Sequence, residues 1–331
     1  MSAETLAHIS NNLVYSAMVV YAGAMYFYAA ELAFGSPRRR PRVAAAVEAR
    51  ELATVGGGTD GEHVELRPVT AETGDDRVAR AGRLGRIAVS LTVLAFALHL
   101  GAVVARGVSA GRPPWGNMYE FSTAGSLAVT GVFLVLLTRK DIRYLGTFVV
   151  LPVLLTLGLA VSVLYTESAQ LVPALKSVWL VIHVTAAMIA SGIFTIAFAQ
   201  SVCFLVQDHR ERVPAEVRGA SFMDRLPSAA VLDRSAYKMH AFAYPIWTFA
   251  IIAGAIWAEN AWGRYWGWDP KETWAFITWM VYTAYLHARA TAGWKGRRAA
   301  YLAGLGYSTF LFNYLVVNIW LVGFHSYAGV K

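Results

Sequence analysis

The chain has 331 residues, of which 56% are apolar and only 15% are charged, and its mean hydropathy is +0.45. Soluble domains carry about a quarter charged residues, so this composition argues against a soluble globular protein. Several apolar runs of about 18 residues or more are long enough to cross a bilayer as helices. The short alternating segments of a membrane barrel are missing. The sequence therefore predicts an all-α, polytopic membrane protein, a helical bundle in the bilayer.

Eight apolar segments are predicted to span the membrane. In chain order they are residues 10–34, 86–106, 119–138, 144–165, 176–206, 238–258, 273–290 and 300–322. The first has no basic leader and is followed by Pro37 and three arginines rather than a cleavage site, so we expect a retained helix and not a signal peptide. The fifth is longer than a bilayer requires, and its inner end is expected to project from the membrane.

Three parts are predicted along the chain. Residues 1–34 form the first membrane helix, residues 35–85 a variable cytoplasmic loop, and residues 86–331 a seven-helix membrane domain. Within the loop, residues 55–76 are polar and rich in glycine, a composition typical of disordered segments. Residues 42–53 are compatible with a short surface helix.

The basic residues predict the orientation of these helices. With the N-terminus outside, the outer segments hold six basic residues, which leaves 23 of the 29 Lys and Arg residues in cytoplasmic loops and adjoining helix ends. The positive-inside rule then places both termini on the extracytoplasmic side of a plasma or inner membrane. The net charge of +8 is explained by basic loops beside anionic lipid, without nucleic acid as a partner.

Only one cysteine, Cys203, is present. It cannot form an intramolecular disulfide, and without a C-x-x-C or C-x-x-C-H motif the chain neither exchanges dithiols nor carries covalently attached haem. Cys203 is therefore predicted to be a small packing residue.

Six of the eleven tryptophans fall between Trp257 and Trp279. Tryptophan is enriched at membrane interfaces, but such a belt is shared among many helix ends, whereas this cluster occupies one outer loop, residues 257–274, and its flanks. Glycines and a proline interrupt the helix here, so a shaped aromatic surface is expected. Its predicted members are Trp262, Tyr265, Trp266 and Trp268.

Asp269 and Pro270 are predicted to open the seventh helix, with Asp269 as its N-cap and a structural rather than acid–base role. An aromatic platform suits a large, flat, apolar ligand, and Arg264 and Lys271 are placed to receive carboxylates. A porphyrin with two propionates fits this description, and its iron would need axial ligands, usually imidazoles.

The histidines supply candidate ligands. His183, two turns into the fifth helix, and His325, just beyond the eighth, lie at the level of the tryptophan loop and are the predicted axial pair. His287, on the inner half of the seventh helix, is a further candidate ligand away from this level, because ionisable groups inside a membrane are costly and tend to be functional. For His99 and His240 we favour structural packing.

Residues 262–274, WGRYWGWDPKETW, resemble the tryptophan-rich WWD motif of haem-handling membrane proteins. The DPKETW ending, which includes Trp274, is similar to the system II cytochrome c biogenesis family of the CcsA or ResC type, called CcsB in some bacteria. The segment 114–121 (PWGNMYEF), His287 and the closing His325-Ser326-Tyr327 agree with this resemblance, which spans residues 113–328.

The resemblance implies that the WWD loop, flanked by His183 and His325, presents haem b as a transient substrate outside the membrane. By position, His287 matches a membrane histidine that helps haem enter from the inner side. A CcsB- or ResB-type membrane partner supplies the other histidine, so this chain alone should lack a complete inner site. Apocytochrome c, with reduced C-x-x-C-H thiols, and thiol-reducing pathway proteins are the further implied partners of this haem lyase, which forms thioether bonds.

Two alternatives stay open at this point. One is a b-type electron-transfer subunit that oxidises quinol, although such bundles usually hold paired histidines at matching depths on facing helices. The other is a transporter of another hydrophobic anion, although the inverted repeats common in that class are not detected.

Overall fold

The computed structural model describes residues 2–34, 71–167, 176–214, 217, 219 and 221–325, and every regular element in those ranges is helical. The predicted all-α fold is therefore confirmed. The predictions for residues 35–70 and for Ser326 and Tyr327 fall outside the described residues.

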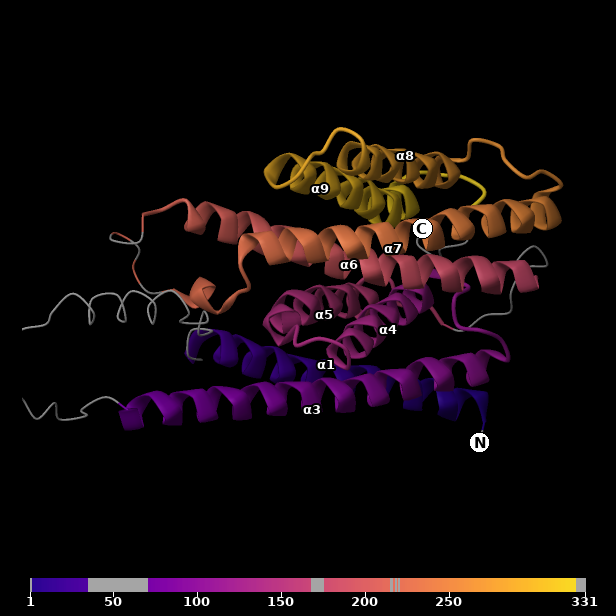
Figure 1. Cartoon of the computed structure of the whole chain (residues 1–331). Coiled ribbons are helices and arrows are strands. Elements are labelled where there is room, and N and C mark those ends of the chain that lie inside the picture. Colours follow the sequence, from indigo (N-terminus) through magenta and orange to yellow (C-terminus); the bar gives the residue numbers. More distant parts are fainter. Residues whose placement is uncertain are drawn as a thin grey trace, which may run out of the picture.

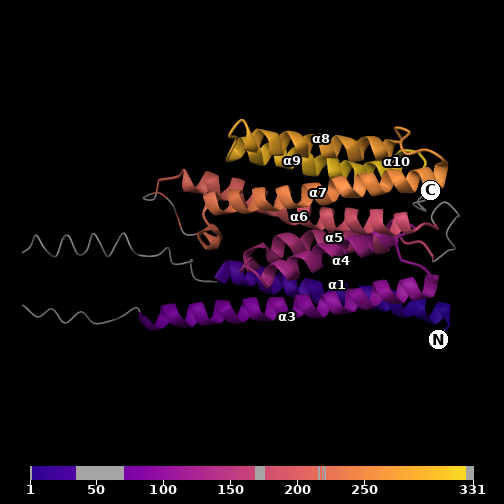
Figure 2. The same cartoon turned by 45° about the vertical axis from the view of Figure 1, so that its right-hand side comes forward.

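Eight main helices alternate in direction to build an elongated bundle (Figures 1 and 2). They are α1 (Ala3–Phe34), α3 (Ala71–Ala110), α4 (Met118–Leu137), α5 (Gly146–Ser162), α6 (Val178–Glu211), α7 (Ala229–Trp262), α8 (Pro270–Ala290) and α9 (Arg297–Leu311). A π-helical segment, η5 (Phe312–Val317), and a short α10 (Asn318–Trp320) continue α9. Short 3₁₀ turns, η1 (Arg143–Leu145) and η4 (Phe222–Arg225), precede α5 and α7.

One end of the bundle carries the tryptophan loop, and we call it the tryptophan end. The connections 111–117 and 263–269 and the segment 321–325 lie there, together with the start of α1 (Figure 2). The opposite end carries the connections 138–142 and 291–296. This alternation places the predicted outer segments at a single end.

Seven of the described helices are long and apolar enough to cross a membrane, and together they make this a polytopic membrane protein. The prediction of eight spans is confirmed only for those seven. The predicted span 273–290 does form a helix, α8, beside α7 and α9 (Figure 1), but its composition is too polar to qualify. Lys271, Glu272, Tyr282, His287 and Arg289 lower its hydropathy.

The predicted boundaries are too narrow at several helix ends. α3 begins at Ala71, so residues 71–85 of the predicted loop are helical, and α7 begins at Ala229 instead of residue 238. An apolar window detects the part of a helix that meets hydrocarbon, whereas helical hydrogen bonding continues beyond it.

Two large buried clusters and two smaller ones hold the bundle together. In the first, Tyr21 and Tyr28 of α1 pack with Phe133 of α4 and with Cys203, whose predicted packing role is confirmed. In the second, α6 to α9 enclose Phe194, Trp247, Tyr282, Tyr285 and Tyr307. The candidate site lies at the tryptophan end of this second cluster.

Candidate functional site

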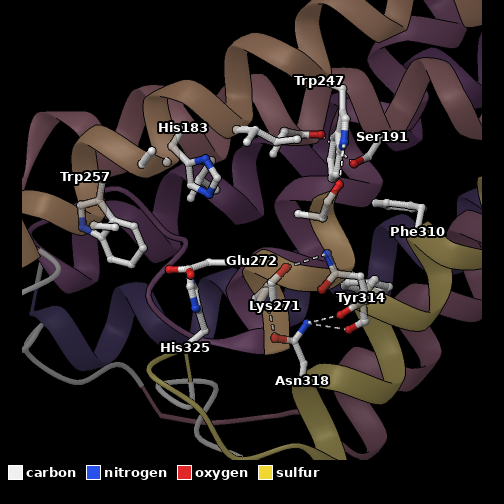
Figure 3. Close-up of a pocket in the computed structure, with 18 of the residues that line it drawn as sticks. His183, Ser191, Trp247, Trp257, Lys271, Glu272, Phe310, Tyr314, Asn318 and His325 are labelled. Atoms are coloured by element: carbon white, nitrogen blue, oxygen red, sulfur yellow. Dashed lines mark hydrogen bonds between the residues drawn. The ribbon is translucent and has the colours of Figure 1, made fainter. Parts of the chain in front are cut away.

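A cavity with a mainly apolar lining lies among α4, α6, α7, α8, α9 and the η5–α10 segment (Figure 3). His183 and His325, which are 142 positions apart in the numbering, both line it. The structure therefore brings the two outer histidines into one cavity, while their role as ligands stays a prediction.

His183 is fixed on α6 by a hydrogen bond across to α7. Its Nδ1 lies 2.7 Å from the carbonyl oxygen of Ala250. A carbonyl can only accept, so Nδ1 carries the proton and Nε2 keeps its lone pair. Gly254 permits this approach, because a Cβ at that position would lie 2.7 Å from the imidazole Nδ1 and Cε1.

His325 is fixed by Asp269. Its Nδ1 lies 2.8 Å from the carboxylate Oδ2, and the Phe324 amide donates to Oδ1 over 2.6 Å. Burial would raise the pKa of Asp269, but hydrogen bonds from His325 and the Phe324 and Lys271 amides outweigh it and hold that pKa below its usual range. Burial also lowers the pKa of His325, which favours the neutral ring. The carboxylate accepts from Nδ1, so Nε2 again remains the free nitrogen.

The predicted N-cap is confirmed, and Asp269 does more than the loop role assigned from sequence. Asp269 and Glu272 form a reciprocal capping box at the start of α8, with Pro270 in the first turn. The same carboxylate that starts the helix also anchors His325. One residue therefore sets both the beginning of α8 and the position of a candidate ligand.

Trp257 contacts both imidazoles and is a ring that the predicted aromatic surface did not include. It stacks on His183 at an interplanar angle of 10°, with centroids 6.2 Å apart, and its centroid is 5.6 Å from that of His325. Trp262 adds an edge-on contact to His325 at 5.0 Å. The signal in the sequence that could have identified Trp257 is its position at the start of the tryptophan cluster.

The predicted aromatic surface divides into two groups. Tyr265 and Trp266 line the cavity. Trp262 and Trp268 are outside its lining, and Trp268 is 65% exposed beside Trp266. Trp268 also has a φ of 56°, a strained value for a bulky residue, which is typical of functional loops.

The predicted carboxylate-binding pair also divides. The Lys271 ammonium lines the cavity and donates to the Asn318 side-chain oxygen. Arg264 is outside the lining: its Nη1 is 3.8 Å from Glu272, and its guanidinium lies 4.5 Å from the centre of the Phe324 ring. Trp274 is likewise outside, because it faces η5 and packs against Phe312 at 4.0 Å.

The π-helical segment supplies cavity residues that sequence reasoning missed. Asn313 and Tyr314 of η5 line the cavity, followed by Asn318 of α10. The side-chain oxygen of Asn313 is buried and has no hydrogen-bond partner within the described structure. π-Helical turns are rare and occur often at functional sites.

The segment 114–121 is held by a buried carboxylate. Glu120 is fully buried and accepts hydrogen bonds from Arg106 Nε at 3.1 Å, Arg112 Nη1 at 2.6 Å and the Gly116 amide at 2.8 Å. This network fixes the start of α4 and so places Phe121 in the cavity wall.

The other membrane histidines lie elsewhere. His287 is exposed on α8, near the opposite end of the bundle, and is not part of the cavity. His99 and His240 are fully buried and are also outside the lining. Among the described residues, no three His, Cys, Asp or Glu side chains converge as a metal site.

Comparison with known proteins supports the resemblance. The profile of the Cytochrome C assembly protein family matches residues 115–325. A cytochrome c biogenesis protein CcsA from Synechococcus sp. (strain JA-2-3B'a(2-13)) is 33% identical over 306 residues, covering 76% of this chain and 85% of that protein. The CcsA of Guillardia theta is 37% identical over 247 residues, covering 68% and 80%.

A solved structure, the cytochrome c haem lyase CcmF, matches with a TM-score of 0.60 and 15% identity. The match covers 95% of this chain and 47% of CcmF, and at this identity it shows a shared fold alone. The family profile and the CcsA relatives, which align over most of their own lengths, settle the assignment: this chain belongs to the cytochrome c assembly protein family, in its CcsA type, and acts in cytochrome c biogenesis.

Proposed function

We propose that this protein is the haem-handling subunit of a system II cytochrome c synthase. It holds haem b as a transient substrate in the cavity at the tryptophan end and presents it to apocytochrome c. The observation that carries the proposal is the pair His183 and His325, which share one cavity and each have Nδ1 engaged. Two imidazole Nε2 atoms are the axial ligands that a six-coordinate haem iron uses.

The rest of the cavity offers apolar surfaces and a positive charge that suit haem. Trp257 contacts both imidazoles and Trp266 lines the wall, which provides apolar surfaces for the macrocycle. Lys271, held by Asn318, is the cation available inside the cavity for a propionate. Arg264 is occupied at the rim by Glu272 and Phe324, so we assign the carboxylate-binding role to Lys271 first.

The attachment step needs positioning and no net oxidation. Each thiol of the apocytochrome C-x-x-C-H motif adds across a haem vinyl group: sulfur bonds to one carbon, and hydrogen goes to the other. Both thiols come from the apocytochrome, since this chain has one buried cysteine, and thiol-reducing pathway proteins keep them reduced. The role of this chain is to hold the vinyl groups in reach and shield the iron.

We place this chemistry on the extracytoplasmic face of the cell membrane. The basic residues concentrate in segments that the positive-inside rule assigns to the cytoplasm, which leaves the tryptophan end outside. His287 then lies on the inner half of α8 as an exposed imidazole. A CcsB- or ResB-type partner, with a second imidazole on a helix against α8, would complete an inner haem site and remove the cost of exposing His287 to lipid.

The test is an absorption spectrum of the chain purified with its partner. We expect a two-imidazole haem b spectrum that weakens in His183→Ala and in His325→Ala, because only the inner site would still bind haem. We expect both variants to lose holocytochrome c formation. His209→Ala is the matched control, because His209 is exposed at the far end of the same helix as His183.

Other outcomes point to the remaining alternatives. Unchanged covalent haem attachment in both cavity variants would remove the axial assignment. A haem that is reduced by quinol and stays bound through turnover would favour the electron-transfer subunit. A preparation without haem under all conditions would favour the anion transporter.

A further inference from the structure

Five aromatic rings form a continuous ladder along the seam between α7 and α8. Tyr244 stacks on Trp279 with centroids 5.9 Å apart, and Trp279 stacks on Phe276 at 5.8 Å. Phe276 meets Trp266 at 6.4 Å and Trp268 at 6.1 Å, and these two tryptophans are 5.7 Å apart. The ladder thus runs from the middle of α7 to the tryptophan loop.

One end of the ladder lies in the wall of the candidate haem cavity, and the other end lies one helical turn from His287. At the tryptophan end of the bundle, Trp266 lines the cavity that holds His183 and His325. At the other end, the Tyr244 hydroxyl is 2.7 Å from that of Thr283, one helical turn before His287 on the same face of α8. From His287 to the start of α8 is about 25 Å along the helix, and the ladder covers most of this distance.

The ladder borders the second buried cluster. Tyr282 and Tyr285 are buried in that cluster, and Tyr244 and Trp279 pack against it from outside. All five ladder rings keep part of their surface exposed, so a molecule that moves along the seam can reach them.

The polar groups of Trp279 and Tyr244 are already used within the protein. The Trp279 indole N–H donates to the Thr248 hydroxyl at 3.0 Å, and Tyr244 is hydrogen-bonded to Thr283. The part of these two rings that stays exposed is therefore mainly apolar, which suits a flat apolar molecule such as a haem macrocycle. A haem macrocycle is wider than the spacing between successive rings, so it would contact two of them at each position.

We propose that this aromatic ladder is the surface along which haem moves between the region of His287 and the cavity at the tryptophan end. The inference rests on the proposed function, because it supplies the route by which haem reaches that site. No bond forms or breaks along the ladder, and the order of use is Tyr244, Trp279, Phe276 and then Trp266.

The test replaces the two middle rings while keeping apolar volume, in Phe276→Leu/Trp279→Leu. Expressed with its partner, this double variant should carry about tenfold less haem from the cell and form correspondingly less holocytochrome c, since two stacking contacts are lost. Haem added to the detergent-solubilised variant should still give the two-imidazole spectrum, because the cavity ligands are intact.

Two further variants serve as controls. Trp279→Phe keeps an aromatic ring at this position of the ladder and should load haem as the unmodified protein does. Phe242→Ala removes a more exposed ring on α7, half a turn away from Tyr244, and should load as the unmodified protein does.

Three results decide the inference. Normal loading of the double variant in cells would overturn it. Failure of the solubilised variant to bind added haem would also overturn it, because the rings would then belong to the cavity site itself. An unmodified protein that binds no haem in either assay would instead reject the proposed function.

Discussion

Two pairs of histidines inside the same bundle differ in their surroundings. His183 and His325 each have one ring nitrogen anchored to an oxygen and border a cavity. His99 and His240 are fully buried in closed packing, where His99 Nε2 and both nitrogens of His240 have no partner within the described structure. Under the proposed function, burial is a poor guide to haem ligation in this bundle, whereas an anchored Nδ1 beside open space is a good one.

The largest effect on haem binding is expected when Asp269, which anchors His325, is changed and His325 itself is kept. Asp269→Asn should weaken haem binding by about 10- to 100-fold, as for other partners of metal-bound histidines. The amide can donate to Nδ1, which would place the proton of His325 on Nε2. Haem titration of the solubilised protein, followed by absorption, measures this effect.

Asp141→Asn is the control for the loss of a carboxylate. Asp141 pairs with Arg143 at the opposite end of the bundle and is half exposed. Equal haem affinity in Asp269→Asn and the unmodified protein would show that the anchor does not orient His325.

A smaller effect is expected from crowding the other imidazole. In Gly254→Ala the new Cβ would lie 2.7 Å from His183, so the ring must move, and haem affinity should fall by about tenfold. Gly158→Ala is the matched control within α5, because its Cβ would meet nothing within 4 Å. If both glycine variants bind haem equally well, the packing of α7 against His183 is not needed for the site.

The smallest effect is expected for His240, one of the two histidines that we assign to packing. His240→Phe keeps a ring among Phe194, Tyr282 and Tyr285 and removes two unpaired buried nitrogens. Its free energy of unfolding should change by no more than about 1 kcal/mol, and the haem spectrum should be unchanged. Thermal unfolding followed by circular dichroism measures the first quantity. Loss of the haem spectrum would place His240 among the ligands.

The sequence predicted the helical membrane fold and the residues that meet at the tryptophan end. Apolar length marks spans directly, and the depth of His183 and His325 along their helices depends only on counting residues from the membrane boundary. The capping role of Asp269 is a local signal that needs no knowledge of packing.

The direction in which each side chain points could not be predicted in the same way. Trp257 faces the histidines and Trp274 faces η5, although both belong to one tryptophan cluster. The rotation of each helix is set by its neighbours, which a single sequence does not specify. The same limit hid the division between Lys271 inside the cavity and Arg264 at its rim.

The π-helical segment determines which face the last helix presents to Lys271. Each residue of an α-helix turns the chain by about 100°, so one extra residue per turn changes which face every later residue presents. Phe312–Val317 contains such a wide turn, between the part of α9 that packs in the core and Asn318, which meets Lys271. If the same residues formed a regular α-helix, Asn318 would be rotated by about 100° around the helix axis, away from Lys271. Deletion of a single residue within the π-helical segment would instead give a regular helix in which Asn318 still faces Lys271.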